Sequence, residues 1–297
     1  MATAAGGPAP HRCAVTWLDV FTSRPLAGNA LAVVHDADGV DDTAMLAFAR
    51  ETRLSETTFV QAAQDPAAAD YRNRIWCMSG ELPFAGHPTL GTAVAEARRR
   101  GGERDVSLVQ QTASGLQAIE LELGTGAVHR GSMLQAPAEA GRLVDPVLAL
   151  GAAGLKAADA DPDLPCQVVS TGLPHLLAPV GSREALDRLA PSLRTVEALL
   201  AETHATCLYL AHVDAEAGVA HARSIFLDPG TLSEDPATGS AAGPLCAHVA
   251  AHGGSGELVV HQGEAMGRPS RIACALEADG IRVGGECVVV MEAHARF

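Results

Sequence analysis

The stretches HPTLGTA (87–93) and DPATGSA (235–241) decide how this chain is organised. They align without gaps, with proline, glycine and alanine in the same places and a threonine opposite a serine. Each follows a strand-like segment with similar residues, RIW (74–76) and RSIF (223–226), and each leads into a helix-like run that ends in Gly-Gly. This similarity predicts an internal duplication, with two equivalent turns that face each other across a cleft.

The length and composition indicate a globular protein of two domains. The 297 residues are too many for one ordinary core. Hydrophobic residues make up 47%, charged residues 19% and aromatic residues only 3%, so the cores must consist of Val, Leu, Ala and Ile. A net charge of −14 argues against nucleic acids and anionic membranes as partners, because both favour basic surfaces. No apolar run approaches the ~18 residues of a membrane span.

The cysteines and the N-terminal residues indicate a cytoplasmic protein. Seven dispersed cysteines without a CxxC pair are typical of reduced thiols. Residues 1–13 lack a charged segment followed by an apolar one, and we interpret them as a disordered leader rather than a signal peptide.

Strand-like and helix-like segments alternate in both halves. In the first half we expect strands at 15–21, 30–36, 57–63 and 71–78, and helices at 41–52 and 89–102. In the second half we expect strands near 166–180, 204–212 and 219–227, a helix near 183–202 and a helix ending at 253–254. The closing segment, 257–297, is predicted as several strands with turns at 278–280 and 284–285. Strands outnumber helices in each half, which favours an α+β fold over a doubly wound sheet.

A Gly-Ser pair at the start of a helix suggests a site for an anion. The N-terminus of a helix offers unpaired backbone N–H groups and a partial positive charge. Glycine lets an anion approach closely, and the hydroxyl adds a donor. Two such N-termini facing one cleft would suit a small carboxylic acid as substrate. The alternative is that Ser233 or Asp235 simply caps the helix, and the segment alone does not separate the two interpretations.

Six segments occur in the order found in the phenazine-biosynthesis PhzF-like isomerase family, which the chain resembles from about Val15 to its C-terminus. They are LDVFTSRPLAGNALAVV, LSETTFV, ELPFAGHPTLGTA, MLQAP, VVSTGLPHLL and SEDPATGSAAGPL. The resemblance implies two similar domains of the diaminopimelate epimerase type, each a curved, mostly antiparallel sheet around a central helix, with the active site in the interdomain cleft. We place these domains at 14–128 and 129–297, with the last strand as a candidate to pack on the N-terminal domain. The resemblance also implies a homodimer.

The family's functional positions carry over one residue at a time. Glu56 matches the catalytic general acid/base, and His87 and Asp235 match polar residues beside the substrate. The positions that help to hold the ligand's carboxylate are matched by Gly86, Gly239 and Ser240. The family's GN motif is present as Gly28-Asn29, followed by Ala30 where a proline is often found.

Position 85 bears on the mechanism, because it holds Ala85 where many relatives have a cysteine. A two-base epimerase needs a thiol on each face of its substrate, and neither Ala85 nor the DPATG motif provides one. A single base therefore fits better: Glu56 would remove a proton from an activated carbon and return it elsewhere on the same face. Partial burial is expected to raise the pKa of Glu56, and a position at a helix N-terminus is expected to keep His87 neutral.

Metal and cofactor sites are weaker hypotheses. Cys246, His248 and His252 could share a helix face, but no acidic or further cysteine partner lies at ligand spacing, so we expect no metal. No glycine-rich nucleotide motif opens a helix after a strand, and we expect no organic cofactor. Together with these absences, the resemblance implies a cofactor-independent isomerase for a small, unsaturated carboxylate.

The resemblance suggests a substrate like trans-2,3-dihydro-3-hydroxyanthranilate and a role in secondary metabolism such as antibiotic biosynthesis. A hydrolase or lyase that uses the same acid/base site is one alternative. A non-catalytic scaffold protein is the other.

Overall fold

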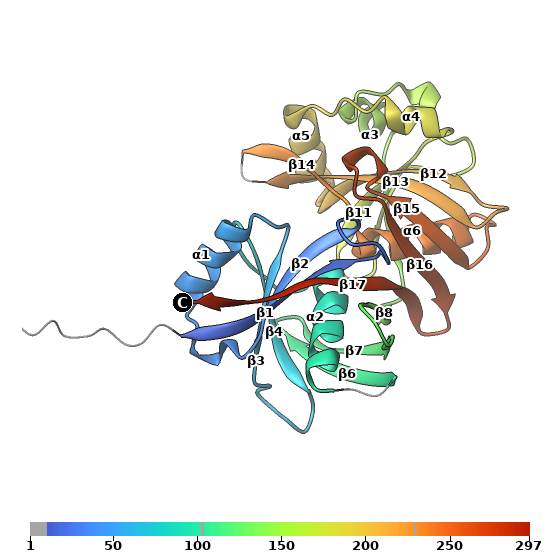
Figure 1. The fold of residues 1–297 in the computed structure, drawn as a ribbon. Helices are drawn as coiled ribbons and strands as arrows, with labels where there is room; N and C mark the ends of the chain where they lie inside the picture. The colour runs from blue at the N-terminus through green and yellow to red at the C-terminus, as the bar shows by residue number, and fades with distance from the viewer. Residues whose placement is uncertain (1–10, 102–103, 229) are drawn as a thin grey trace, which may run out of the picture.

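The chain folds into two lobes, each built around one central helix. The structure, a computed structural model, describes residues 11–101, 104–228 and 230–297. Figure 1 shows α2 (Gly86–Arg99) in the middle of the first lobe and α6 (Gly239–Ala251) in the second. Within the described residues, strands of both lobes join in one sheet of 17 strands. This mixture of many strands and few helices confirms the predicted α+β class.

The strands of the first lobe are β1 (Arg12–Val20), β2 (Asn29–Val34), β3 (Thr57–Gln61), β4 (Tyr71–Cys77), β5 (Gly80–Leu82), β6 (Asp105–Thr112), β7 (Gly115–Glu122) and β8 (Val128–Gln135). Its other helices are η1 (Ala37–Gly39) and α1 (Asp42–Thr52). The second lobe has β9 (Glu139–Leu143), β10 (Gln167–Ser170), β11 (Pro174–Pro179), β12 (Cys207–Asp214), β13 (Val219–Asp228), β14 (Thr231–Asp235), β15 (Glu257–Gln262), β16 (Ser270–Glu277) and β17 (Gly280–Arg296). Its helices besides α6 are α3 (Pro146–Ala152), η2 (Ala157–Asp159), α4 (Arg183–Asp187), α5 (Leu193–Thr203) and η3 (Glu264–Met266).

The same order of strand pairing occurs in both lobes. In the first, β2–β3 is parallel, β3–β4 and β4–β5 are antiparallel, β4–β6 is parallel and β6–β7 is antiparallel. In the second, β11–β12, β12–β13, β13–β14, β13–β15 and β15–β16 repeat that series. The helices α2 and α6 occupy the same place in the two series, before the strand that adds in parallel. The pairing pattern thus has the repeat that the two sequence motifs suggest.

The matched motifs nevertheless begin their helices at different points. In the gapless alignment Gly91 lies opposite Gly239, but Gly91 is the sixth residue of α2 whereas Gly239 is the first of α6. A Cβ at Gly91 would lie 2.6 Å from the Leu31 side chain, so this glycine allows the helix to approach the sheet. The first helix also starts at Gly86 rather than at 89 as predicted, because Pro88 is tolerated in the first turn.

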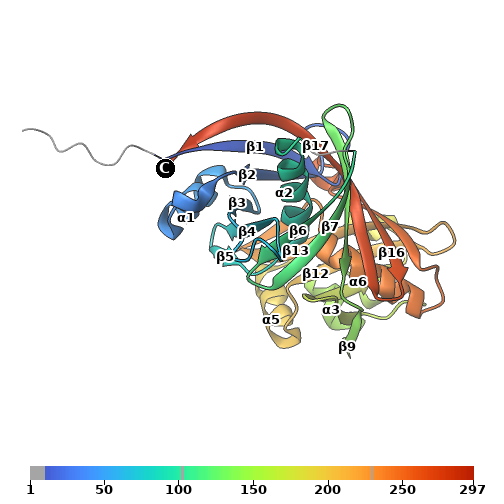
Figure 2. The same ribbon diagram turned by 90° about the horizontal axis from the view of Figure 1, so that it is seen from below.

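The last strand joins the lobes. The start of β17 pairs with β16 and β8, and its end runs antiparallel to β1 from Arg12↔Arg296 onward. Figure 2 shows β1 and β17 arching side by side toward the C-terminus. The predicted turn at Gly284-Gly285 is wrong, because both residues lie inside β17. A Cβ at Gly284 would lie 2.6 Å from the Gly131 carbonyl oxygen, so the glycine permits close strand contact instead of a turn.

Two further predictions need correction. The disordered leader was placed at 1–13, but Arg12 and Cys13 belong to β1, since the long β17 extends far enough to pair with them. His11, also in that leader, exchanges two backbone hydrogen bonds with Phe297, and residues 1–10 lie outside the described residues. The single helix expected near 183–202 is two helices, α4 and α5, because Pro191 disfavours helical backbone before it.

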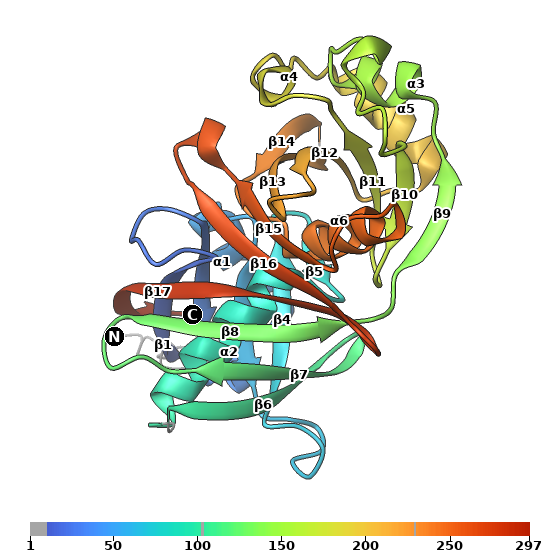
Figure 3. The same cartoon turned by 90° about the vertical axis from the view of Figure 1, so that its right-hand side faces the viewer.

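The cores consist of aliphatic side chains around the two central helices, as the low aromatic content requires. Residues 86–97 of α2 are all buried. Around α2 and α6 lie, among others, Leu18, Leu31, Leu90, Ile119, Met133, Leu177, Leu245, Val260 and Ile272. Figure 3 shows α2 crossing behind β8 and β7, and α6 beside β15 and β16. Among the described residues, no helix combines the length and apolar character needed to cross a membrane.

Candidate active site

The N-termini of the two central helices meet where the lobes join. A Cβ added to Gly86 would lie 3.2 Å from the backbone nitrogen of Ser240 and 3.6 Å from the carbonyl carbon of Gly239. A Cβ at position 86 would thus be in tight contact with the other helix end, and glycine suits this close approach. The sequence predicted that these two N-termini face each other, and in the structure they do.

Neither of these N-termini is capped by a side chain. The N-cap residues are Ala85 and Thr238, and neither side chain accepts a hydrogen bond from its helix. The alternative that Ser233 or Asp235 caps α6 is therefore wrong. Among the described residues, the backbone N–H groups of Gly86, His87, Gly239 and Ser240 have no hydrogen-bond partner, and two converging helix dipoles make this junction favourable for a carboxylate.

The side chains of Glu56 and His87 lie together beside these helix ends. Glu56 directly precedes β3, and His87 is the second residue of α2; Oε2 of Glu56 lies 3.5 Å from Nε2 of His87. The Glu56 side chain is 17% exposed and that of His87 only 5%. Neither of these two atoms has a hydrogen-bond partner among the described residues. Buried polar atoms without a partner are uncommon in folded proteins and are a feature of many catalytic sites.

Burial decides the charge state of both groups. It raises the pKa of Glu56 to about 8, with the Asp235 and Asp228 carboxylates adding to the effect. Burial lowers the pKa of His87 to about 3, against a small opposing contribution from the Ala30 backbone. At neutral pH a mostly protonated carboxyl group thus faces an uncharged imidazole. Perturbations of this size are typical of acid/base sites.

Asp235 completes the group from the second lobe. Its Oδ2 accepts a hydrogen bond from Oγ1 of Thr238 at 2.5 Å, and its Oδ1 accepts one from Nδ2 of Asn29 at 2.7 Å. Burial raises the pKa of Asp235 to about 6, because the desolvation of its carboxylate outweighs these two hydrogen bonds. The structure therefore brings Glu56, His87 and Asp235 to one place, together with Gly86, Gly239 and Ser240.

Asn29 connects the two lobes, and the sequence did not predict its contacts with the site residues. Besides its bond to Asp235, Nδ2 lies 3.1 Å from Nδ1 of His87 and 3.2 Å from the carbonyl oxygen of Ala237. Oγ of Ser55 donates to Oδ1 of Asn29 at 3.3 Å. The available signals were the GN motif, Gly28-Asn29, and a polar residue at the head of an otherwise apolar strand, NALAVV.

Gln262 is a second residue that the sequence did not indicate. Its Nε2 donates to the backbone oxygen of Asp235 at 2.7 Å and to Oγ1 of Thr238 at 3.0 Å. Its Oε1 accepts from the hydroxyl of Tyr209 at 2.9 Å. These contacts hold the turn that presents Asp235, and they depend on strand pairing that a sequence pattern does not show.

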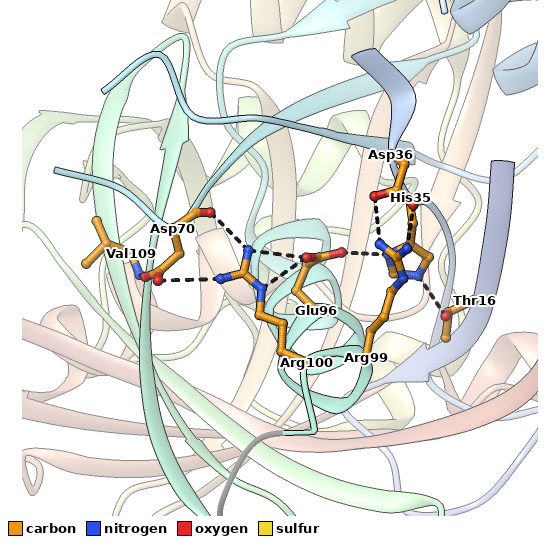
Figure 4. A network of polar contacts seen from close by, with 8 residues as sticks. All are labelled: Thr16, His35, Asp36, Asp70, Glu96, Arg99, Arg100 and Val109. Carbon is orange, nitrogen blue, oxygen red and sulfur yellow. Dashed lines mark hydrogen bonds and ion pairs between the residues drawn. The ribbon is translucent and has the colours of Figure 1, made fainter. Parts of the chain in front are cut away.

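The far end of α2 is anchored by a polar network that Figure 4 shows. His35 bonds to Glu96 at 2.6 Å through Nδ1 and to Thr16 at 2.8 Å through Nε2. Arg100 donates to the backbone oxygen of Asp70 at 2.9 Å. Because these contacts attach α2 to the surrounding strands, they hold the helix that presents His87 in a defined position.

The second lobe offers no carboxylate at the place that corresponds to Glu56. Ile75 pairs with Thr58 in the first lobe, and the matching Ile225 pairs with Leu208 in the second. Glu56 lies two residues before Thr58, and Thr206 lies two residues before Leu208. Thr206 is therefore the position in the second lobe that corresponds to Glu56. Threonine is not a titratable side chain near neutral pH, so the repeat supplies no second base at the position equivalent to Glu56.

The cysteines and histidines considered as other sites lie apart from this junction. Sγ of Cys246 is buried and donates to the carbonyl oxygen of Gly256, and Nε2 of His248 bonds to that of Pro165 at 3.0 Å. In the described part of the chain, no three His, Cys, Asp or Glu side chains are grouped so as to hold a metal ion. A groove of about 1580 Å³ lies elsewhere; residues of β6, β7, β8, β15, β16 and β17 and of the loop after β1 line it, and none of the predicted site residues does.

Curated proteins with similar sequences carry the name of an isomerase. The chain is 38% identical over 280 residues to a trans-2,3-dihydro-3-hydroxyanthranilate isomerase of Pseudomonas aeruginosa, which covers 92% of this chain and 93% of that protein. A relative of Pseudomonas chlororaphis with the same name is 37% identical over 259 residues, covering 85% of this chain and 86% of the relative. These names confirm the prediction of an isomerase.

Solved structures share the fold over nearly the whole chain. A predicted epimerase from Pseudomonas aeruginosa superposes with a TM-score of 0.83 at 36% identity, covering 95% of this chain and 99% of that one. A phenazine biosynthesis protein of the PhzF family from Bacillus anthracis gives 0.82 at 27% identity, with 96% and 99% covered. The sequence profile of the phenazine biosynthesis-like protein family matches residues 18–293, and the chain belongs to that family.

Proposed function

We propose that this isomerase acts, without a cofactor, on a small unsaturated carboxylate of the trans-2,3-dihydro-3-hydroxyanthranilate type. The observation that carries the proposal is the buried pair of Glu56 and His87 beside two uncapped helix N-termini. The curated relatives that bear the name of this activity support the substrate class.

In this proposal the substrate carboxylate lies at the helix ends. The backbone N–H groups of Gly86, His87, Gly239 and Ser240 and the Ser240 hydroxyl are the donors for it. Neutral His87 can hydrogen-bond the substrate without competing for its charge. Asp235 orients the amine or hydroxyl group of the substrate from the opposite side.

Glu56 carries the proton in the proposed reaction. With a pKa of about 8, roughly a tenth of these side chains are ionised at pH 7, and that fraction can remove a proton from the substrate carbon. The negative charge that develops is delocalised toward the substrate carboxylate, where the helix N-termini stabilise it. Glu56 then returns the same proton to a different carbon, so that one C–H bond breaks, another forms and no atom is gained or lost.

The wider setting is part of the same proposal. We place the protein in the cytoplasm, as a homodimer of chains with domains 14–128 and 129–297, and in secondary metabolism such as antibiotic biosynthesis. The dispersed cysteines support the compartment. The repeated pairing pattern supports two domains, and β8 (Val128–Gln135), which pairs with both β7 and β17, lies at the proposed boundary between them.

The test is single-turnover kinetics and calorimetry on Glu56→Gln, with Glu51→Gln as the matched control on an exposed residue of α1. Glutamine keeps the shape but cannot accept the proton, so we expect the rate to fall ~10²-fold or more while binding stays within about tenfold. His87→Ala and Asp235→Ala should weaken both. In D₂O, deuterium entry into the product reports the exchange of the proton on Glu56.

The alternatives predict other results. Near wild-type turnover in Glu56→Gln would remove Glu56 from the mechanism. Products of bond cleavage would instead support a hydrolase or lyase. Ligand binding without any turnover in the wild type would support a scaffold protein.

A further inference from the structure

The loop between β1 and β2, residues 21–28, has a strained conformation and ends next to Asn29. Phe21 and Leu26 have φ angles of 64° and 67°, which residues other than glycine rarely adopt. Gly28 has a φ of 60°, and a Cβ there would lie 2.3 Å from the carbonyl oxygen of Val20. A loop with this geometry keeps its shape only where its surroundings impose it.

Arg268, from the turn between η3 and β16 in the second lobe, imposes much of this shape. Its Nε donates to the carbonyl oxygen of Gly28 at 2.8 Å, while Nη2 donates to the Ala27 carbonyl at 2.8 Å and to Oδ1 of Asp19 at 2.6 Å. The Asp19 side chain is only 2% exposed, and its Oδ2 accepts from the backbone N–H of Leu26 at 2.6 Å. A buried carboxylate thus ties the strained loop to a guanidinium group of the other lobe.

The same turn also holds the part of the site that the second lobe contributes. The backbone N–H of Arg268 donates to the carbonyl oxygen of Gly263 at 3.0 Å. Oγ of Ser270 donates to the Pro236 carbonyl oxygen at 3.0 Å, and Gln262 donates to that of Asp235 at 2.7 Å. The segment 262–270 therefore contacts both the loop before Asn29 and the turn that presents Asp235.

We propose that Arg268 is a positioning residue that sets the Asn29 amide against His87 and Asp235. The Gly28 carbonyl that accepts from Nε belongs to the peptide unit whose N–H is that of Asn29. This hydrogen bond therefore orients the backbone from which the Asn29 side chain extends. Arg268 has its effect through Asn29 and does not itself touch the reacting groups.

The kinetic test rests on the proposed function and uses Arg268→Gln, Arg268→Lys and a double variant with Asn29→Ala. Lysine keeps the charge but lacks the planar fork that serves three acceptors. We expect kcat to fall about tenfold or more in both single variants, with KM changed by less than about threefold, because the site is misaligned rather than emptied. In the Asn29→Ala background, Arg268→Gln should cause little further loss, since both residues act in one series of contacts.

The matched control is Arg271→Gln, on the same hairpin. The side chain of Arg271 is exposed, and its backbone N–H donates to the Phe21 carbonyl oxygen at 2.8 Å, a contact that the substitution keeps. We expect wild-type kcat in this variant. Unchanged kcat in a folded Arg268→Gln, or its full effect in the Asn29→Ala background, would overturn the assignment.

A second readout needs no turnover and separates this inference from the proposed function. The ¹⁵N chemical shift of His87 Nδ1 reports its contact with Asn29, and Arg268→Gln should move it in the same direction as Asn29→Ala. Failure of the wild type to convert the substrate would refute the proposed function, but the comparison of the Nδ1 shifts in Arg268→Gln and Asn29→Ala would remain valid. An unmoved Nδ1 resonance in Arg268→Gln, or in Arg268→Lys where Arg268→Gln does not fold, would refute the role of Arg268.

Discussion

Replacing Glu56 with glutamine is expected to stabilise the folded protein, and to do so increasingly as the pH rises. Burial, with Asp235 and Asp228 nearby, raises the pKa of Glu56 from 4.5 to about 8. The folded protein therefore resists ionisation of this carboxyl group, whereas the unfolded chain ionises it freely above pH ~4.5. Glutamine resembles the protonated carboxyl group in shape and cannot ionise, so the substitution removes that cost.

The direction and the size of the expected change in unfolding free energy follow from the pKa of Glu56 in the unfolded and in the folded state. A folded-state pKa that is raised contributes stability that is complete below the unfolded-state pKa and is lost as the pH rises through the folded-state pKa. The wild type therefore loses this contribution between pH 4.5 and about 8. Each pH unit in that interval corresponds to about 1.4 kcal/mol. The unfolding free energy of Glu56→Gln should therefore exceed that of the wild type by roughly 3 kcal/mol at pH 7 and by at most about 5 kcal/mol above pH 8.

The assay is urea unfolding of the wild type and Glu56→Gln at intervals from pH 4.5 to pH 9. The control is Glu51→Gln, which removes the same charge from an exposed position on α1. We expect the difference in unfolding free energy to grow with pH for Glu56→Gln and to stay small and nearly flat for Glu51→Gln. A flat difference for Glu56→Gln, or one that falls with pH, would refute the buried, protonated carboxyl group.

Two other expectations concern the sheet and the need for metal. Gly284→Ala should lower the free energy of unfolding by about 1–3 kcal/mol, because the added Cβ would lie 2.6 Å from the Gly131 carbonyl oxygen on β8. Thermal unfolding measures this, with Gly126→Ala as the control, since its Cβ would meet open space. Prolonged dialysis against EDTA should leave the rate unchanged, because the proposed proton transfer uses only Glu56, His87 and Asp235. A loss restored by zinc would contradict that and direct attention to Cys246, His248 and His252.

The motifs in the sequence located the central helices and the candidate site residues. Glu56, His87 and Asp235 could be named because each stands in a short, specific motif, and the close approach of Gly86 to Ser240 agrees with the expected meeting of two helix ends. Strand and helix types were also mostly predictable, since they follow from local periodicity and from glycine and proline.

Local sequence patterns gave wrong predictions where a residue contacts a segment that lies far away along the chain. Gly284-Gly285 looks like a turn but lies within β17, because the glycines let β8 and the Phe21 region approach that strand. Arg12 and Cys13 looked like part of a leader but pair with the last residues of the chain. In both cases the partner is more than a hundred residues away, and a sequence window does not contain it.

The sequence by itself determined the α+β class and the aliphatic cores, and its resemblance to the family pointed to Glu56 as the candidate acid/base group. Only the tertiary structure decided the surroundings of that group. The pKa values of Glu56, His87 and Asp235 depend on burial and on neighbours from the other lobe, and Asn29, Gln262 and Arg268 enter the site through strand pairing. The physical reason is that desolvation and hydrogen bonding are set by the distances between atoms in space, which a residue's neighbours along the chain do not specify.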